Sequence, residues 1–524
     1  MSRTFEKALI LGFLVAGCGG GDDSVLDLGL DALGGLSALQ SVQAISIEVS
    51  GETFDPGQGV SPEQSVQGST YSVSHTFDMD ANAARSEWEI ATSYFFPPRT
   101  FQFTEIARPD QGYVDGIDSH VIPEEQSAML STRTSTIQKQ ERMSNPLLLL
   151  RTAAENTAVV VERLQRVIDG KSYRVLAIAD GLQPIDVFID PDTGLPARAA
   201  TLEDDPVFGD VLMEVVYDDW REVDGLEVPF SLTHQLAGRT IRTENRTAVT
   251  INPATASDAF DVPEALRLPH DDFLATWGEL SHAYFRRWQS IGLPFYFPQA
   301  QATLTQVGDA PGVFWLTGGT HHSMVIEMAD HLIVVEAPLY ELRSNGVLAA
   351  LEQQFGDKPV RHLVATHHHH DHIGGARTFA AAGATLVIPE AAEGFVEEFL
   401  AAPHTLVPDA LQGSTASVDL MTVSDKVVLS DGTRNVEVLS LETEHTDGML
   451  VVWLPEEGIL FTSDMYSPGL APPGTQAAGE QLEAANELVD FVTSRALPVE
   501  TFVGGHGLAF GTLAELKTLA GRAQ

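Results

Sequence analysis

The chain has 524 residues, which predicts two or three domains and excludes a single small module. Hydrophobic residues make up 44% of the sequence and charged residues 20%, so the composition excludes a disordered chain. Acidic residues outnumber basic ones by 73 to 30, giving a formal charge of −43. Because phosphate binding needs a cationic face, we expect no nucleic-acid partner.

The first residues have the features of an export signal. Arg3 and Lys7 precede an apolar run over residues 8–16, which is too short to span a bilayer but suits the core of a signal peptide. The run ends in the sequence VAGC, which resembles a bacterial lipobox with Cys18 as the lipidated residue. Residues 1–17 are therefore expected to be a lipoprotein signal peptide.

Cys18 is the single cysteine of the chain, so a disulfide within the chain is excluded. Residues 18–35 begin with glycines and aspartates and predict a flexible tether. We therefore expect an exported protein on the periplasmic or cell-surface side, with the outer membrane favoured. The N-terminal lipid anchor is its one expected contact with a membrane, and the oligomeric state is left open.

Residues 36–265 predict a mostly antiparallel β domain. Apolar and polar residues alternate from Ile45 to Val49, as in a half-buried strand, and Asp224-Gly225 is a typical two-residue hairpin turn. The spacing of strands and turns along the sequence resembles that of the curved half-barrels of periplasmic lipoprotein-sorting carriers. A hydrophobic-ligand carrier with an accessory metal domain is thus one alternative for the function.

Residues 266–300 predict a connecting helix and linker. Aromatic and aliphatic residues recur at spacings of three and four over 271–289, which indicates one apolar helical stripe. Glycine and prolines over 292–298 end it.

Residues 301–524 predict an α/β domain, because strand-like and helix-like segments alternate there. A buried strand over 360–365 leads into the sequence THHHHDHIGG, which begins at Thr366. Imidazole and carboxylate side chains at this density are suited to a first-row metal ion. Further candidate ligands follow in separate segments, at His445, Asp464 and His506.

This order of residues resembles the metallo-β-lactamase superfamily, whose signature is His-x-His-x-Asp-His followed by a His, an Asp and a last His. The resemblance implies an αββα four-layer sandwich with the site at the edges of the sheets. It also implies two zinc ions, with other divalent first-row metals possible. By position, one metal would be held by His367, His369 and His445, the other by Asp371, His372 and His506, and Asp464 would bridge them.

Asp371-His372 fixes the register of the histidine run and leaves His368 and His370 at spacer positions. Asp371 is also expected to orient the attacking group and move a proton. Three further side chains are candidates for substrate contact. His321 and His322 lie in a loop that the fold places over the site, and Tyr466 follows the bridging carboxylate by two residues.

The expected activity is that of an exported binuclear zinc hydrolase that cleaves an ester, lactone, thioester or amide of a small-molecule substrate by a metal-bound hydroxide. Asp464 at the bridging position is typical of hydroxyacylglutathione hydrolases, lactonases and related esterases. A β-lactamase or a phosphodiesterase of the same fold, and a mononuclear iron dioxygenase, are alternatives. The charge and the export signal count against a polyanionic substrate.

Overall fold

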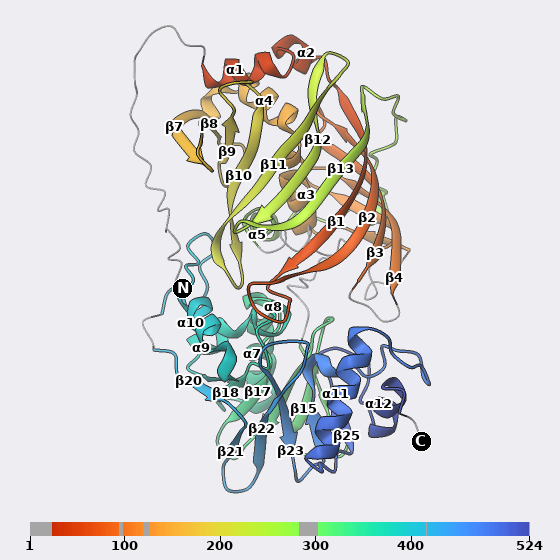
Figure 1. The fold of residues 1–524 in the computed structure, drawn as a ribbon, viewed down its shortest axis with the longest axis vertical. Coiled ribbons are helices and arrows are strands. Elements are labelled where there is room, and N and C mark those ends of the chain that lie inside the picture. Colours follow the sequence, from red (N-terminus) through yellow and green to blue (C-terminus); the bar gives the residue numbers. More distant parts are fainter. Residues whose placement is uncertain (1–23, 94–97, 119–124, 282–301, 415–416, 523–524) are drawn as a thin grey trace.

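The computed structural model describes residues 24–93, 98–118, 125–281, 302–414 and 417–522, which form two domains (Figure 1). The expected signal peptide over 1–17 and Cys18 lie outside the described residues, as does most of the expected linker beyond residue 281. Within the described ranges, none of the helices combines the length and the apolar character needed to cross a bilayer.

The N-terminal domain is a 13-stranded sheet in which every pair of neighbouring strands is antiparallel. The strand order is β6-β5-β4-β3-β2-β1-β13-β12-β11-β10-β9-β8-β7. The bounds are β1 (Ala44–Pro56), β2 (Ser65–Asp78), β3 (Ala83–Thr92), β4 (Arg99–Ala107), β5 (Gly112–Ile117), β6 (Gln126–Ala128), β7 (Val160–Ile168), β8 (Lys171–Ile178), β9 (Ile185–Ile189), β10 (Pro196–Asp205), β11 (Gly209–Val223), β12 (Leu226–Leu236) and β13 (Arg239–Ile251).

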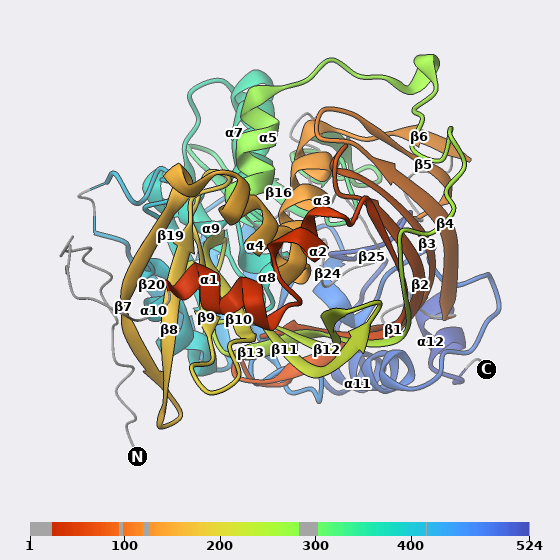
Figure 2. The same cartoon turned by 90° about the horizontal axis from the view of Figure 1, so that it is seen from above.

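This sheet curves around two helices, α3 (Ser131–Ser144) and α4 (Pro146–Glu155) (Figure 2). Side chains alternate between the helices and the solvent, as in β3, where Trp88 and Ile90 are buried and Glu89 between them is exposed. Asp224 and Gly225 connect β11 to β12 with positive φ angles, as the hairpin prediction requires. The predicted antiparallel β domain is confirmed.

Two short helices, α1 (Val25–Ala32) and α2 (Leu36–Gln40), precede the sheet. The first of them lies in the segment expected to be a flexible tether, which is a correction to that prediction. Ser24 caps the helix by accepting from the backbone N–H of Asp27, and Val25 and Leu30 are buried in the main hydrophobic cluster. The apolar face of this segment therefore binds it to the domain.

Charged side chains lie between the sheet and α3. Lys139 on the helix pairs with Glu203 on β10 at 2.6 Å, and both side chains are almost fully buried. On β13, Glu244 lies 3.2 Å from the guanidinium of Arg242 and 3.3 Å from the imidazole of His234. The concave face of the sheet is thus filled by helices and paired charges.

The C-terminal domain has two sheets, one of seven strands and one of five. The first contains β14 (Thr303–Gln306), β15 (Val313–Thr317), β16 (Ser323–Glu327), β17 (Leu332–Val335), β18 (Val360–Val364), β19 (Thr385–Pro389) and β20 (Leu420–Val423). The second contains β21 (Lys426–Ser430), β22 (Asn435–Leu441), β23 (Met449–Leu454), β24 (Ile459–Phe461) and β25 (Thr501–Val503). The helices are α5 (Asp272–Leu280), between the domains in sequence, and then α7 (Glu341–Phe355), α8 (His370–Ile373), α9 (Ala376–Ala381), α10 (Glu393–Ala401), α11 (Glu480–Ser494) and α12 (Leu513–Leu519).

Three hydrophobic clusters separate four layers in this domain. On β17, Val334 packs toward α7 and α9, whereas Ile333 and Val335 pack toward the second sheet. On β23, Val452 belongs to the cluster between the sheets and Val451 to the cluster beneath α11 and α12. This alternation gives the order helix, sheet, sheet, helix, so the predicted αββα sandwich is confirmed.

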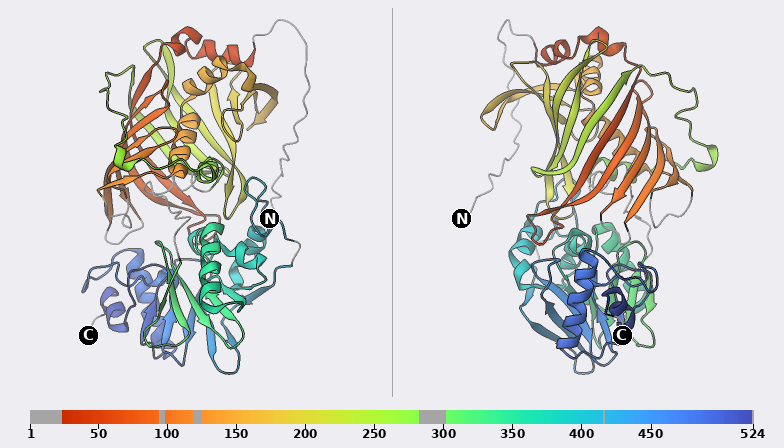
Figure 3. Two further views of the ribbon diagram at one scale, coloured as in Figure 1. Left: turned by 180° about the vertical axis from the view of Figure 1, so that it is seen from behind. Right: turned by 45° about the vertical axis from the view of Figure 1, so that its right-hand side comes forward.

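The two domains are stacked end to end (Figure 3), and two turns of the N-terminal sheet contact the C-terminal domain. The β10–β11 turn inserts Val207 into a hydrophobic cluster of the C-terminal domain. Beside it, Asp204 lies 2.8 Å from His404, and the Asp210 carboxylate accepts from the backbone N–H of Thr405 at 2.9 Å. The β1–β2 turn reaches the region of α8 (Figure 1).

Glu244→Gln should destabilise the protein by about 3 kcal/mol at pH 7, because it leaves buried cations without their partner. Burial alone would raise the pKa of Glu244, but Arg242 and His234 hold it well below its ordinary value. The carboxylate therefore stabilises the fold above its unfolded pKa of about 4.3, and this contribution is lost as the pH falls below it. Urea unfolding at several pH values checks this.

The matched control is Glu87→Gln, because Glu87 pairs with Arg85 at an exposed position. It should change the free energy of unfolding by less than about 1 kcal/mol. Equal losses for the two variants, or a loss for Glu244→Gln that is independent of pH, would contradict the prediction.

Candidate metal centre

The candidate site lies where strands of both C-terminal sheets end. β17 and β18 are parallel, and their carboxyl ends lead to Glu336 and to the histidine run. β24 and β25 are also parallel and lead to Asp464 and His506. Parallel strands bring their carboxyl ends to one edge of a sheet, so segments far apart in sequence meet there.

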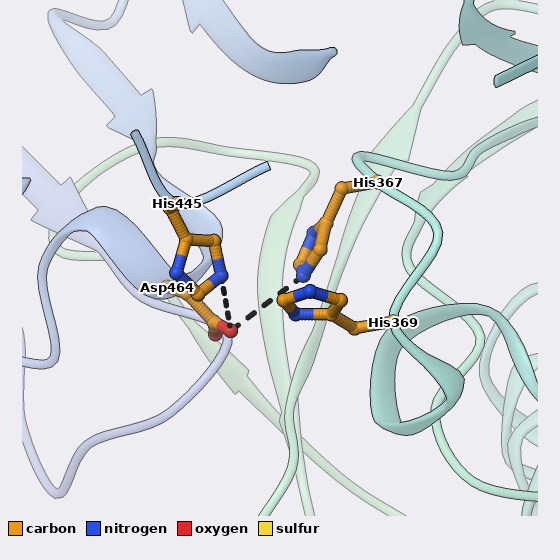
Figure 4. Close-up of side chains that lie close together, drawn as sticks. All are labelled: His367, His369, His445 and Asp464. Carbon is orange, nitrogen blue, oxygen red and sulfur yellow. Dashed lines mark ion pairs between the residues drawn. The ribbon is translucent and has the colours of Figure 1, made fainter. Parts of the chain in front are cut away.

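The first group of side chains consists of His367, His369, His445 and Asp464, whose ligand atoms lie within 4.8 Å of one another (Figure 4). Oδ2 of Asp464 is 3.6 Å from Nε2 of His367 and 3.3 Å from Nε2 of His445. Three imidazoles and one carboxylate oxygen therefore converge on one point.

The second group is formed by His372, His506 and the other oxygen of Asp464. Oδ1 of Asp464 is 2.9 Å from Nε2 of His372 and 3.2 Å from Nε2 of His506. Asp371 joins this group, with its Oδ2 at 3.4 Å from His372 and 3.6 Å from His506. Asp464 thus lies between the two groups and offers one oxygen to each.

The donor atoms of these groups fit divalent metal ions. Nε2 of His367 and of His445, and Oδ1 of Asp464, are buried and have no hydrogen-bond partner among the described residues. Burial lowers the pKa of His367 to about 3, so its imidazole is neutral at pH 7, as a metal ligand must be. Imidazole nitrogen and carboxylate oxygen are the donors that zinc and similar first-row ions prefer.

The carboxylates favour positive charge at the second group. Burial alone would lower the pKa of His506, but Asp464 and Asp371 raise it to about 10. Burial would raise the pKa of Asp464, yet His372 and His506 hold it well below its ordinary value. Protons or metal ions would balance the carboxylates at this point.

Glu336 contacts the ring nitrogen of His372 that faces away from Asp464. Its Oε2 lies 2.9 Å from Nδ1 of His372, and its Oε1 accepts hydrogen bonds from the hydroxyls of Thr366 and Ser463. Glu336 and Ser463 both have positive φ angles, which non-glycine residues rarely adopt. A carboxylate on the outer nitrogen of a ligating histidine fixes its tautomer and its orientation.

The two spacer histidines, His368 and His370, contact residues outside the two donor groups. Nδ1 of His368 lies 2.9 Å from the hydroxyl of Thr446, and its ring packs edge-on against Phe395. His370 accepts a hydrogen bond from Gln58 of the N-terminal domain at 2.8 Å. The structure therefore groups the seven side chains expected from the sequence and sets these two apart.

The three candidate substrate contacts lie in different surroundings. Nε2 of His321 is 3.1 Å from Oδ2 of Asp371, so His321 borders the second group. Nε2 of His322 donates to the carbonyl of Gly507, which fits a role in holding that loop. The Tyr466 ring packs against Phe502 in the cluster beneath α11, and its part in substrate binding stays a prediction.

One contribution to the site was missed in the sequence. Gln58 donates to Asp371 at 2.7 Å, and His369 donates to the carbonyl of Gly59 at 3.0 Å. Both partners belong to the β1–β2 turn, about 310 residues earlier in the chain. Its one signal in the sequence is the tripeptide Gly-Gln-Gly at 57–59. This tripeptide predicts a turn but does not indicate a contact with metal ligands.

Residues 316–506 match the family model of the metallo-beta-lactamase superfamily. This range contains both groups of side chains and extends from β15 to β25, so it is a metallo-beta-lactamase superfamily domain.

Solved structures with a similar arrangement include metallo-beta-lactamases from three organisms. The protein from Pontibacter korlensis is 18% identical, with a TM-score of 0.31 over 42% of this chain and 99% of that chain. The one from Hirschia baltica is 18% identical, with a TM-score of 0.30 over 42% and 97%. FIM-1 from Pseudomonas aeruginosa is 18% identical, with a TM-score of 0.32 over 43% and 97%.

Elemental analysis of the zinc-saturated protein should find two metal ions per chain, because two groups of donors share Asp464. Asp464→Asn should reduce occupancy of the second position, since a neutral amide bridges two cations poorly. About one metal ion per chain with full activity would contradict a binuclear centre.

His369→Ala and His368→Ala form a matched pair that tests the register. Metal content should fall in His369→Ala and stay near that of the wild type in His368→Ala, whose ring packs on Phe395. Equal loss of metal in both variants would show that the register is wrong.

Proposed function

We propose that this protein is a metal-dependent hydrolase of a carboxylic ester, lactone, thioester or amide, acting with two zinc ions. The observation that carries the proposal is the position of Asp464, which offers one oxygen to each of two donor groups. Two bound zinc ions would supply an activated water and polarise the scissile carbonyl. A Ser or Cys nucleophile is then unnecessary.

The residues of the chain would position the reactants and move the proton. Oδ2 of Asp371 faces the second group and is the acceptor for the proton that the attacking water loses. His321 donates from Nε2 to the same oxygen, because its Nδ1 lies 2.6 Å from the hydroxyl of Thr320 and accepts from it. Burial lowers the pKa of His321 to about 3, which keeps this imidazole neutral.

The charges near the site support an uncharged or weakly charged substrate. Of the arginines close to the motif in sequence, Arg377 pairs with Asp409 and Arg361 with Asp330. Arg343 is buried and donates to the carbonyl of Thr317. With the formal charge of −43, this arrangement favours an ester or lactone over a phosphodiester.

The packing of the N-terminal domain counts against the hydrophobic-carrier alternative. A carrier needs an apolar hollow, but α3 lies in the concave face and presents polar side chains such as Thr134, Lys139 and Gln140 to the interior. The ion pair between Lys139 and Glu203 would be costly beside an apolar ligand.

Hydrolysis of an aryl ester or a lactone should exceed that of an aryl phosphodiester, because the acidic protein repels a phosphodiester anion. Comparison of kcat/KM at low and high salt checks this, since salt screens exposed charges beyond about 10 Å. Thioesters and β-lactams complete the panel. A preference for the phosphodiester at both salt concentrations would move the protein to the phosphodiesterase alternative.

We also propose that the protein is exported and anchored to a membrane through lipidated Cys18, on the basis of the sequence VAGC behind a short apolar run. Cell fractionation should find the wild type with the membranes and Cys18→Ser in the soluble fraction. Equal retention of both, or a mature protein that still begins at Met1, would contradict the proposal.

A further inference from the structure

The turn between β1 and β2, residues 57–64, is named the interdomain loop here. It makes hydrogen bonds to two residues of the candidate metal centre and to their neighbours His370 and Asp447. The Gln58 amide donates to Oδ1 of Asp371, Nε2 of His369 donates to the carbonyl of Gly59, and the backbone N–H of Asp447 donates to the carbonyl of Val60. The first two bonds reach side chains of both donor groups.

The interdomain loop has a defined shape of its own. The backbone N–H of Gly57 donates to the carbonyl of Gln64 at 2.7 Å and closes the base of the loop. A Cβ at position 59 would lie 2.5 Å from Cβ of Gln64, so the close approach requires glycine there. Arg239 of β13 donates to the carbonyl of Pro62 and ties the loop to its own domain.

The bond from His369 decides which ring nitrogen can bind a metal. Because a carbonyl can only accept, the proton of the neutral imidazole lies on Nε2, and Nδ1 keeps its lone pair for a metal ion. The carbonyl of Gly59 therefore sets the tautomer.

The bond from Gln58 orients Asp371. It occupies Oδ1 at 2.7 Å, and the carboxylate then turns Oδ2 toward His321, His372 and His506. A carboxylate with both oxygens free could rotate about its last bond, whereas one held at a single oxygen keeps the other in place.

We infer that the interdomain loop is a working part of the metal centre, with Gly59 and Gln58 of the N-terminal domain as positioning residues for His369 and Asp371. The inference rests on the proposed function only in taking the two donor groups as the metal centre. The N-terminal domain thereby sets the metal affinity of the C-terminal domain.

Gln58→Met and a loop replacement test this inference. Methionine preserves the volume of the side chain but removes the N–H donor. In the second variant an Asn-Gly turn replaces residues 57–64 and joins Pro56 to Ser65, which are already paired in the sheet. The matched control is Asp210→Ala, which breaks bonds at the other contact between the domains and touches no member of the donor groups.

Cobalt titration of the full-length protein, with a competing chelator, gives the affinity and the visible absorption spectrum of the centre. Gln58→Met should bind cobalt about tenfold more weakly or worse, and the loop replacement should also change the spectrum. Asp210→Ala should match the wild type in both. Circular dichroism reports the fold of each variant, and Gln58→Met decides the question if the loop replacement does not fold.

Wild-type affinity and spectrum in Gln58→Met would overturn the inference. Equal losses in Gln58→Met and Asp210→Ala would overturn it too, because the loop would then act only through domain contact. If affinity falls as expected but no substrate of the panel is hydrolysed, the inference stands and the proposed hydrolase activity fails.

Discussion

The candidate centre depends on one partly buried carboxylate, Asp464, whose two oxygens face different groups of histidines. Asp464 follows β24 in a turn where Ser463 has a positive φ angle, and this turn aims the side chain between two groups of imidazoles. Removing a carboxylate from water is costly unless positive charge or hydrogen bonds replace the water. The surrounding histidines and a pair of cations would provide that compensation. The arrangement of the strand ends follows from the need to bring these partners together.

The N-terminal domain uses buried charge differently. Its polar interior is closed by fixed pairs, such as Lys139 with Glu203, in which each charge already has its partner. Buried side-chain atoms without a hydrogen bond among the described residues occur in both domains, Glu203 included, but at the candidate centre such atoms of His367, His445 and Asp464 lie close together. Paired charges stabilise a rigid support, whereas several unbonded nitrogen and oxygen atoms that converge on one point indicate a place for a ligand. This contrast distinguishes the supporting domain from the domain that we propose to carry the chemistry.

The sequence predicted the features that depend on local spacing. The His and Asp motif, the strands that precede it and the four layers could be expected from residues 301–524 because each feature extends over a few residues. Helix α1 was missed because the glycines and aspartates before it suggested a flexible tether. Its residues Val25 and Leu30 are nevertheless apolar and buried. Gln58 was missed for another reason. Its partner Asp371 is 313 residues away, and no periodicity encodes such a contact.

Val207 has a consequence for the way the protein unfolds. This residue of the N-terminal sheet is 5% exposed and belongs to a hydrophobic cluster built by strands and helices of the other domain. Opening the contact would expose apolar surface on both sides, so neither domain reaches its full stability by itself. The two domains should therefore unfold in one cooperative transition. Separating them would leave an exposed apolar patch on the C-terminal domain, where other apolar surfaces could bind.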